Sequence, residues 1–170
     1  THAKQTSIAL GRTLRDTRKV RRGLGSIRQD LNVSIMCGDR VEIKGCQDLE
    51  WIPKIIRCEM ARQLHFYRLA NNLREQNNLP KLSHDRNVES PSVKDAVSNL
   101  LKLDIIDVTS AFESCDSQRV TAGIKSGSVM LALPLPGFNG LIGSKEFDSD
   151  GAQLPRLGRE LAGAAKLAGV

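Results

Sequence analysis

The chain has 170 residues, of which 40% are hydrophobic and 26% charged, and this balance excludes a disordered or fibrous protein. Its 25 Lys and Arg residues outnumber its 19 Asp and Glu residues, and the resulting net charge of +6 suits a polyanionic partner. Aromatic residues make up only 4%, which disfavours a base-stacking surface for single-stranded nucleic acid, and no apolar run is long enough to cross a bilayer. We therefore expect a cytoplasmic protein without membrane contact.

The first predicted element is a short amphipathic helix over Ser7–Thr17. A basic run overlaps its end and continues beyond it. The six cations of this run are Arg12, Arg15, Arg18, Lys19, Arg21 and Arg22. Such a run is either a solvated face or a surface that contacts phosphates, and the pattern leaves both open. Glycines at positions 23 and 25 then predict a tight turn.

The next predicted element is a β-hairpin. Apolar and polar residues alternate from Ile27 to Ile35 and again from Arg40 to Ile43, which is the pattern of two half-buried strands. A two-residue loop would place apolar side chains opposite polar ones, whereas a three-residue loop aligns the polar rows of the two strands. We expect the three-residue loop, with Gly38 in the left-handed conformation that such loops usually need.

The rest of the chain predicts helices and one further strand. Asp48 can cap a long amphipathic helix that continues towards Leu73, with Pro53 tolerated near its start. The apolar positions of this helix are Leu49, Ile52, Ile56, Met60, Leu64 and Tyr67. A polar linker over 77–92 precedes a second helix over 92–103. A strand over 129–133 and a final helix over 157–167 follow, so the predicted fold class is α+β.

The predicted hairpin gathers an unusual set of polar side chains. If the polar rows align, one face carries Arg28, Asp30, Asn32, Glu42 and Lys44. Two carboxylates with an amide can bind Mg²⁺ through oxygen, and two cations can neutralise phosphate oxygens, which is the equipment of phosphoryl transfer. The alternative is a solvated strand face with weak ion pairs, although asparagine is disfavoured in strands.

Two neighbouring segments resemble a known family. The sequences RGLGSIRQDLNVSI at Arg22–Ile35 and RVEIKG at Arg40–Gly45 resemble the cradle-shaped kinase domain of the GatE family, a subunit of archaeal glutamyl-tRNA(Gln) amidotransferases. Bacterial GatB relatives carry similar segments. The shared positions are Arg28, Asp30, Asn32, Val33, Ser34, Glu42 and Lys44. They include the whole polar row that the alternation predicts.

Three later segments resemble the insertion domain, or GAD domain, that the GatE family shares with bacterial-type aspartyl-tRNA synthetases. They are DVTSAF at Asp107–Phe112, LPGFNGLIG at Leu135–Gly143 and RLGRELA at Arg156–Ala162. In that domain the glycines of the middle segment would form tight turns around a buried Phe138. The chain departs from the family pattern in a longer, more polar connection over 77–103 and in Asn139, where a small apolar residue is usual.

The resemblance implies a domain layout and a reaction. Residues 1–76 would be the C-terminal part of the cradle-like catalytic domain, 77–103 a linker with a short helix, and 104–170 a truncated insertion domain, so we expect an internal fragment of the GatE protein. The enzyme would use ATP to phosphorylate the side chain of glutamate esterified to tRNA(Gln). Ammonia from a partner subunit, a glutaminase or asparaginase, would then form the amide. We expect the isolated fragment to be inactive.

The resemblance also suggests roles for the polar row. Asp30 and Glu42 would bind Mg²⁺ with Asn32 orienting them, while Arg28 and Lys44 would stabilise phosphoryl charge. The same five residues could instead line the ammonia path or hold the substrate carboxylate. The residues expected to contact RNA are Arg18, Arg21, Arg22, Arg156 and Arg159. The alternative function is a non-catalytic tRNA-binding module of a tRNA-modifying or aminoacylation enzyme.

Overall fold

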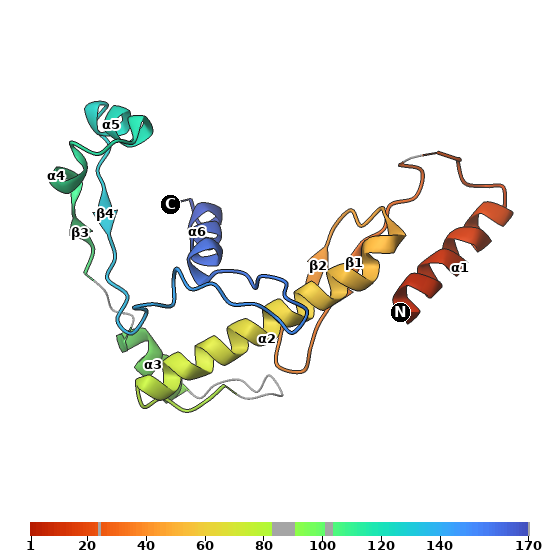
Figure 1. Ribbon diagram of the computed structural model, residues 1–170, viewed down its shortest axis with the longest axis horizontal. Helices are drawn as coiled ribbons and strands as arrows, with labels where there is room; N and C mark the ends of the chain where they lie inside the picture. The colour runs from red at the N-terminus through yellow and green to blue at the C-terminus, as the bar shows by residue number, and fades with distance from the viewer. Residues whose placement is uncertain (24, 83–90, 101–103, 170) are drawn as a thin grey trace.

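The computed structural model describes residues 1–23, 25–82, 91–100 and 104–169, and one long helix sets its shape. Helix α2 (Ile52–Gln76) has helix α1 (His2–Asp16) and a β-hairpin at one end and the C-terminal elements towards the other (Figure 1). The chain exposes 12,943 Å². A compact protein of 18.7 kDa would expose roughly 8,300 Å². The fold is therefore open, and few of its side chains are fully buried.

The hairpin consists of β1 (Leu31–Val33) and β2 (Val41–Ile43), which pair antiparallel. Asn32 lies opposite Glu42, and the apolar residues on either side of each lie opposite one another. The polar and apolar rows therefore align as the sequence predicts. Both residues that flank Asn32 are buried, whereas Asn32 and Glu42 are exposed.

The connection between the strands differs from the prediction. Both strands are shorter than the alternation predicts, and residues 34–40 connect them in place of a three-residue loop. The physical reason is that the backbone beyond Val33 bonds to the side chain of Gln63 on α2 and so leaves the ladder. The prediction that Gly38 is left-handed is wrong. Glycine is needed there because a Cβ would collide with the amide group of Gln63.

A small apolar core joins the hairpin to the start of α2. Its buried members are Leu31, Cys46 and Ile52, of which Ile52 is fully buried. Partly buried residues from α1, β2, the 3₁₀ turn η1 (Leu49–Trp51) and α2 pack against them. The Asp48 side chain accepts the N–H of Glu50 at 2.9 Å, so it caps η1 and not α2 itself.

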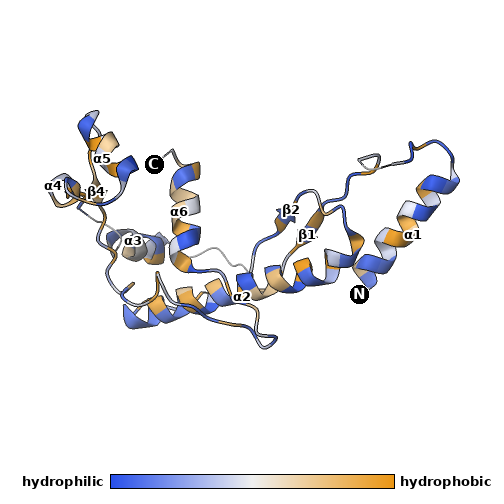
Figure 2. Cartoon of the chain, turned by 45° about the horizontal axis from the view of Figure 1, so that its top comes forward, coloured by the Kyte–Doolittle hydropathy of each residue, from blue (hydrophilic) through white to orange (hydrophobic). Residues whose placement is uncertain are grey.

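The apolar stripe predicted for α2 is only partly right. Ile52 is buried, but Met60 is 44% exposed. Glu59 and Gln63, one before and one after Met60, are buried instead. Figure 2 shows polar and apolar residues alternating along α2. The buried face of this helix is therefore decided by the polar groups that pack on it as well as by its apolar residues.

The C-terminal half adds helices and a second two-stranded sheet. Its helices are α3 (Pro91–Leu100), α4 (Thr109–Phe112), α5 (Gln118–Lys125) and α6 (Leu157–Leu167). Strand β3 (Ile106–Asp107) pairs antiparallel with β4 (Leu131–Ala132). Helix α6 has the predicted bounds, whereas β4 is shorter than the strand predicted over 129–133. Parts of the predicted linker and second helix, residues 83–90 and 101–103, lie outside the described residues.

The predicted glycine turns are present in this half. Gly137 and Gly140 have φ angles of +78° and +77°, and the N–H of Leu141 donates to the carbonyl of Phe138 at 3.0 Å. Phe138 is only partly buried, however, and not buried as predicted. The reason is that the half has little core: among its described residues, Leu157 is the buried apolar side chain. Large apolar residues are exposed instead, among them Ile105, Ile106, Val129, Leu131 and Leu133.

The combination of helices with small antiparallel sheets makes the fold class α+β, as predicted. The division into a cradle-like and an insertion domain remains a prediction. Within the described ranges, no helix combines the length and the apolar character needed to cross a membrane.

Candidate active site

The outward face of the hairpin carries the predicted polar row. Asn32 on β1 lies directly opposite Glu42 on β2, and both side chains are exposed. Arg28 and Asp30 precede Asn32 and form an ion pair, while Lys44 follows Glu42 and pairs with it. The structure therefore brings these five residues together on two paired segments.

Asp30 links the two segments. Its Oδ1 accepts the backbone N–H of Gly45 at 2.8 Å, and Nε of Arg28 donates to the same oxygen at 3.2 Å. The hydrogen bond from Gly45 and then that from Arg28 lower the pKa of Asp30 below its ordinary value. Asp30 is therefore an ionised and oriented carboxylate at neutral pH. Both bonds fall on Oδ1, so within the described part of the chain Oδ2 stays available to a ligand.

Glu42 is held more loosely than Asp30. Its Oε2 lies 3.6 Å from Nζ of Lys44, and the two side chains are 50% and 66% exposed. An ion pair with this exposure contributes little to stability, because water screens the attraction between its charges. Glu42 and Lys44 can therefore each turn to a ligand at small cost.

The donor set fits one of the usual ways in which proteins bind Mg²⁺. This ion commonly takes one or two protein carboxylates and completes its shell with water and substrate phosphates. Asp30 and Glu42 supply carboxylates, and Asn32 supplies an amide oxygen. In the part of the chain that the structure describes, no three His, Cys, Asp or Glu residues form a group that could hold a metal alone. Binding of Mg²⁺ by the row remains a prediction.

A cleft of about 680 Å³ opens beside Asp30, between α1 and the segment that leads into β1. Four arginines belong to its lining, namely Arg15, Arg21, Arg22 and Arg28. Asp30 is the carboxylate of that lining. The volume lies in the range of small-molecule sites, and the excess of arginines suits phosphate oxygens.

A glycine turn explains how arginines separated in sequence reach one cleft. Gly23 and Gly25 have φ angles of +111° and +78°, which glycine adopts without strain. Ser26 closes the turn, because its N–H and its hydroxyl donate to the carbonyl of Gly23 at 3.3 and 2.8 Å. The sequence predicts this turn. It does not predict that the two arginines before the turn line a cleft with Arg28 and Asp30, because as part of a basic run they indicate a separate RNA surface. The other three members of the polar row are outside the described lining of this cleft; they are Asn32, Glu42 and Lys44.

Helix α1 forms the other wall of the cleft. The amide Nε2 of Gln29 donates to Oγ of Ser7 at 2.7 Å, which ties α1 to the segment before β1. Ser7, Gly11 and Arg15 all belong to the lining. Their four-residue spacing puts them on one helix face and is the signal in the sequence that indicates this wall.

The other residues predicted to bind RNA lie elsewhere. Arg18 follows the end of α1 in a left-handed conformation, with φ of +56°, and is exposed outside the described lining of the cleft. Arg156 and Arg159 are exposed at the start of α6, where they line a different hollow. The predicted RNA surface is therefore divided among three places.

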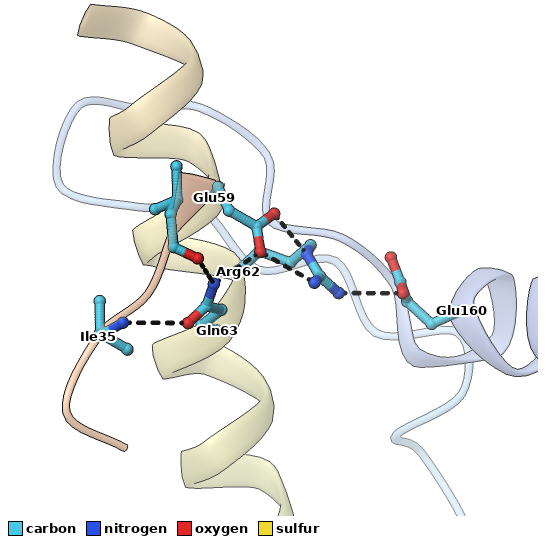
Figure 3. A network of polar contacts seen from close by, with 6 residues as sticks. Ile35, Glu59, Arg62, Gln63 and Glu160 are labelled. Carbon is cyan, nitrogen blue, oxygen red and sulfur yellow. Dashed lines mark hydrogen bonds and ion pairs between the residues drawn. The ribbon is translucent and has the colours of Figure 1, made fainter. Parts of the chain in front are cut away.

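A polar network behind the hairpin holds β1 on α2 (Figure 3). The amide Nε2 of Gln63 donates to the carbonyl of Val33 at 3.1 Å and to Oε1 of Glu59 at 2.9 Å. Its Oε1 accepts the N–H of Ile35 at 3.3 Å. Glu59 also accepts two hydrogen bonds from Arg62, at 2.8 and 3.0 Å. The sequence shows the i,i+3 and i,i+4 spacing of Glu59, Arg62 and Gln63, but it does not indicate that they are buried, because such polar pairs are common on solvent-facing helix surfaces.

Burial and hydrogen bonds shift the pKa values of the charged groups in this network. Burial alone would raise the pKa of Glu59, but the hydrogen bonds from Arg62 and Gln63 hold it below its ordinary value. The hydrogen bond to Glu59 raises the pKa of Arg62 in turn. Nη1 of Arg62 also donates to Glu160 of α6 at 3.2 Å. The network therefore runs from α6 through α2 to β1.

Comparisons with known proteins relate these features to a family. Residues 1–128 match the family described as the GatB/GatE catalytic domain. The chain is 43% identical over 164 residues to the GatE subunit of glutamyl-tRNA(Gln) amidotransferase from Thermococcus gammatolerans, a match that covers 96% of this chain and 22% of that protein. It is 39% identical over 171 residues to the same subunit from Methanocaldococcus jannaschii, a match that covers 99% of this chain and 23% of that protein. The chain thus spans about a fifth of the length of these curated relatives.

Proposed function

The chain belongs to the family of GatB/GatE catalytic domains, and from this premise we propose that its cleft and polar row form part of the site that phosphorylates glutamate on tRNA(Gln). The relatives are named as a subunit of glutamyl-tRNA(Gln) amidotransferase. One observation supports the proposal most: four arginines belong to the lining of the cleft beside Asp30. ATP carries a run of negative phosphates, and arginines are the side chains best suited to their oxygens.

The proposed reaction has two steps. An oxygen of the glutamate side-chain carboxylate attacks the γ-phosphorus of ATP, the bond from that phosphorus to the bridging oxygen breaks, and ADP leaves. Ammonia then attacks the activated carbonyl carbon and loses a proton, and inorganic phosphate leaves with the bonding electrons. The product is glutamine esterified to the same tRNA. Activation is needed because a free carboxylate is a poor electrophile towards ammonia.

The residues of the polar row take distinct parts in this proposal. Asp30 and Glu42 would hold Mg²⁺, and the amide of Asn32 would orient them. When bound, the ion would neutralise charge on the phosphate oxygens. Arg28 orients Asp30 through their 3.2 Å hydrogen bond and lines the cleft, so it can stabilise charge on the phosphoryl group as it moves. Lys44 is only weakly paired and can serve another phosphate oxygen.

The basic residues fall into two groups in this proposal. Arg21 and Arg22 lie in the cleft, so we assign them to substrate phosphates and not to the body of the tRNA. Arg18, Arg156 and Arg159 are outside the described lining of the cleft and remain the candidates for RNA contact. Ammonia would come from a partner of the amidotransferase, its glutaminase or asparaginase subunit.

Asp30→Asn in the complete amidotransferase assembly tests the proposal. The substitution keeps the shape of the side chain and removes its charge, so amidation of Glu-tRNA(Gln) should slow by about 10²–10³-fold while tRNA affinity changes little. Asp116→Asn makes the same chemical change at an exposed position outside the cleft and should leave the rate unchanged. A decrease of less than about tenfold for Asp30→Asn would contradict the assignment, because a directly used charge is worth more.

The exposed cations favour a second function, tRNA binding without chemistry by this chain. Arg156 and Arg159 stand together at the exposed start of α6. If binding is the whole function, replacing both by alanine would lower tRNA affinity and flatten its salt dependence, because fewer counterions would be released. Asp30→Asn would then leave the amidation rate unchanged. Measuring rate and affinity on the same variants separates the two functions.

A further inference from the structure

Gln63 occupies the place of a neighbouring strand at the edge of β1. In a parallel sheet, the N–H of one residue donates to a carbonyl of the neighbouring strand. The carbonyl of the same residue accepts an N–H that lies two residues farther along that neighbouring strand. Gln63 makes this pair of bonds with its side chain, to the carbonyl of Val33 at 3.1 Å and from the N–H of Ile35 at 3.3 Å. A primary amide on a helix therefore satisfies the backbone that a third strand would otherwise satisfy.

The orientation of this amide is fixed by its neighbours. The second hydrogen of Nε2 points to Oε1 of Glu59, at 2.9 Å. A flipped amide would set its oxygen against that ionised carboxylate and lose the bond to Val33. Arg62 holds Glu59 in turn through two hydrogen bonds. Glu59 and Gln63 are each only 8% exposed, so water does not compete for these groups.

We propose that Gln63 is a positioning residue for the candidate active site, an inference that rests on the proposed function. Gln63 bonds to the backbone on both sides of Ser34. These bonds, which we call the clamp, fix the register of β1 against β2 and thus keep Asn32 opposite Glu42. β1 is three residues long and has one partner strand among the described residues. A hairpin of this size is weakly held by itself, so its register depends on the clamp. Asp30, on the same segment, moves with it.

Two substitutions in the complete assembly test the clamp. Gln63→Leu keeps the approximate size and removes both backbone bonds. Gln63→Glu keeps an acceptor for the N–H of Ile35 but replaces the donor to Val33 with an oxygen. The matched control is Leu69→Ala, at a buried position of the same helix that is 7% exposed and outside the network. All variants are assayed well below their unfolding temperatures, and Tm is measured for each.

We expect both Gln63 variants to lower kcat for amidation by about 10–100-fold, because a displacement of about 1 Å at a catalytic group can cost this much. KM for Glu-tRNA(Gln) should stay unchanged. Hydrogen exchange at the amide of Ile35 should become faster in Gln63→Leu, which locates the lost contact. Leu69→Ala should lower Tm by at least as much and keep its kcat.

The outcomes separate this inference from the function on which it rests. Equal losses of kcat in Gln63→Leu and Leu69→Ala would overturn the positioning role, because activity would then follow stability alone. If Asp30→Asn keeps the wild-type kcat, the proposed site is wrong and the positioning role falls with it. An inactive Asp30→Asn together with a fully active Gln63→Leu would overturn the positioning role alone.

Discussion

Removing the carboxylate of Glu59 is the sharpest test of the network that supports β1. The side chain is 9% exposed and accepts hydrogen bonds of 2.8 and 3.0 Å from Arg62 and of 2.9 Å from Gln63. Removing one partner of a buried ion pair costs about 3–5 kcal/mol, because the other charge is left without compensation. Arg62 keeps its bond to Glu160 and is 26% exposed. We therefore expect Glu59→Ala to lower the free energy of unfolding by about 3 kcal/mol, the low end of that range.

Glu50→Ala is the matched control for this prediction. Oε2 of Glu50 lies 2.5 Å from Nζ of Lys4, closer than either bond from Arg62 to Glu59, but the Glu50 side chain is 74% exposed. Exposed pairs contribute about 0.2–1 kcal/mol, so this loss should be the smaller one. Urea unfolding of the intact protein at neutral pH gives both values. Equal losses in the two variants would refute the reasoning, because distance and not burial would then decide the energy.

Comparing wild type with Glu59→Ala also predicts that the free energy of unfolding depends on pH. The pKa of Glu59 in the folded protein lies below its ordinary value of 4.5, so folding favours the ionised form. Its contribution is fully present above the unfolded-state pKa and is lost as the pH falls through the folded-state pKa. The difference in unfolding free energy between wild type and Glu59→Ala should therefore shrink in acid. A difference that stays constant into acid would show that the carboxylate charge is not its source.

Two further predictions address the hairpin. Gly38→Ala should weaken the hydrogen bonds of Gln63 and lower the urea midpoint of unfolding, because the new Cβ would collide with the Gln63 amide. Gly143→Ala is the control, because a Cβ there meets open space, and it should lower the midpoint less. Equal shifts of the midpoint would contradict the contact between Gly38 and Gln63. Arg28→Ala should raise the pKa of Asp30 only part of the way to its ordinary value, because a backbone N–H is the larger cause of the lowering. An NMR titration measures this, and a complete return to the ordinary value would show that the arginine alone is responsible.

The faces of the hairpin could be predicted from the sequence, whereas the ends of its strands could not. Alternation with a period of two depends only on neighbouring residues, so it correctly placed Asn32 and Glu42 in one row. The ladder stops where it does because Gln63, thirty positions from Val33, takes over the hydrogen bonds of β1. A partner this far away leaves no local pattern. The burial of Glu59 on α2 is missed for a different reason. Its partners Arg62 and Gln63 are three and four residues away, a spacing that is common on solvent-facing helix surfaces.

The candidate site was predictable in composition but not in extent. The polar row follows from alternation and family resemblance, and each of its five members lies on the hairpin segments. The cleft depends instead on two left-handed glycines and on the packing of α1, which bring Arg15, Arg21 and Arg22 beside Arg28. A basic run in a sequence does not reveal which of its cations belong to the lining of a cleft. Only the three-dimensional structure separates these arginines from Arg18, which is outside the described lining of the cleft.

The use of a side-chain amide at the edge of β1 also bears on why the polar row stays open. A third strand would satisfy the same carbonyl and N–H groups of β1, but its side chains would stand on both faces of the sheet, next to Asn32 on one of them. Gln63 satisfies these groups from α2, which packs on the buried side of the strand. The outward face keeps its charges free of neighbours from that edge. Support from a helix thus gives β1 a fixed position and leaves the exposed Asn32 and Glu42 accessible, as the proposed function requires.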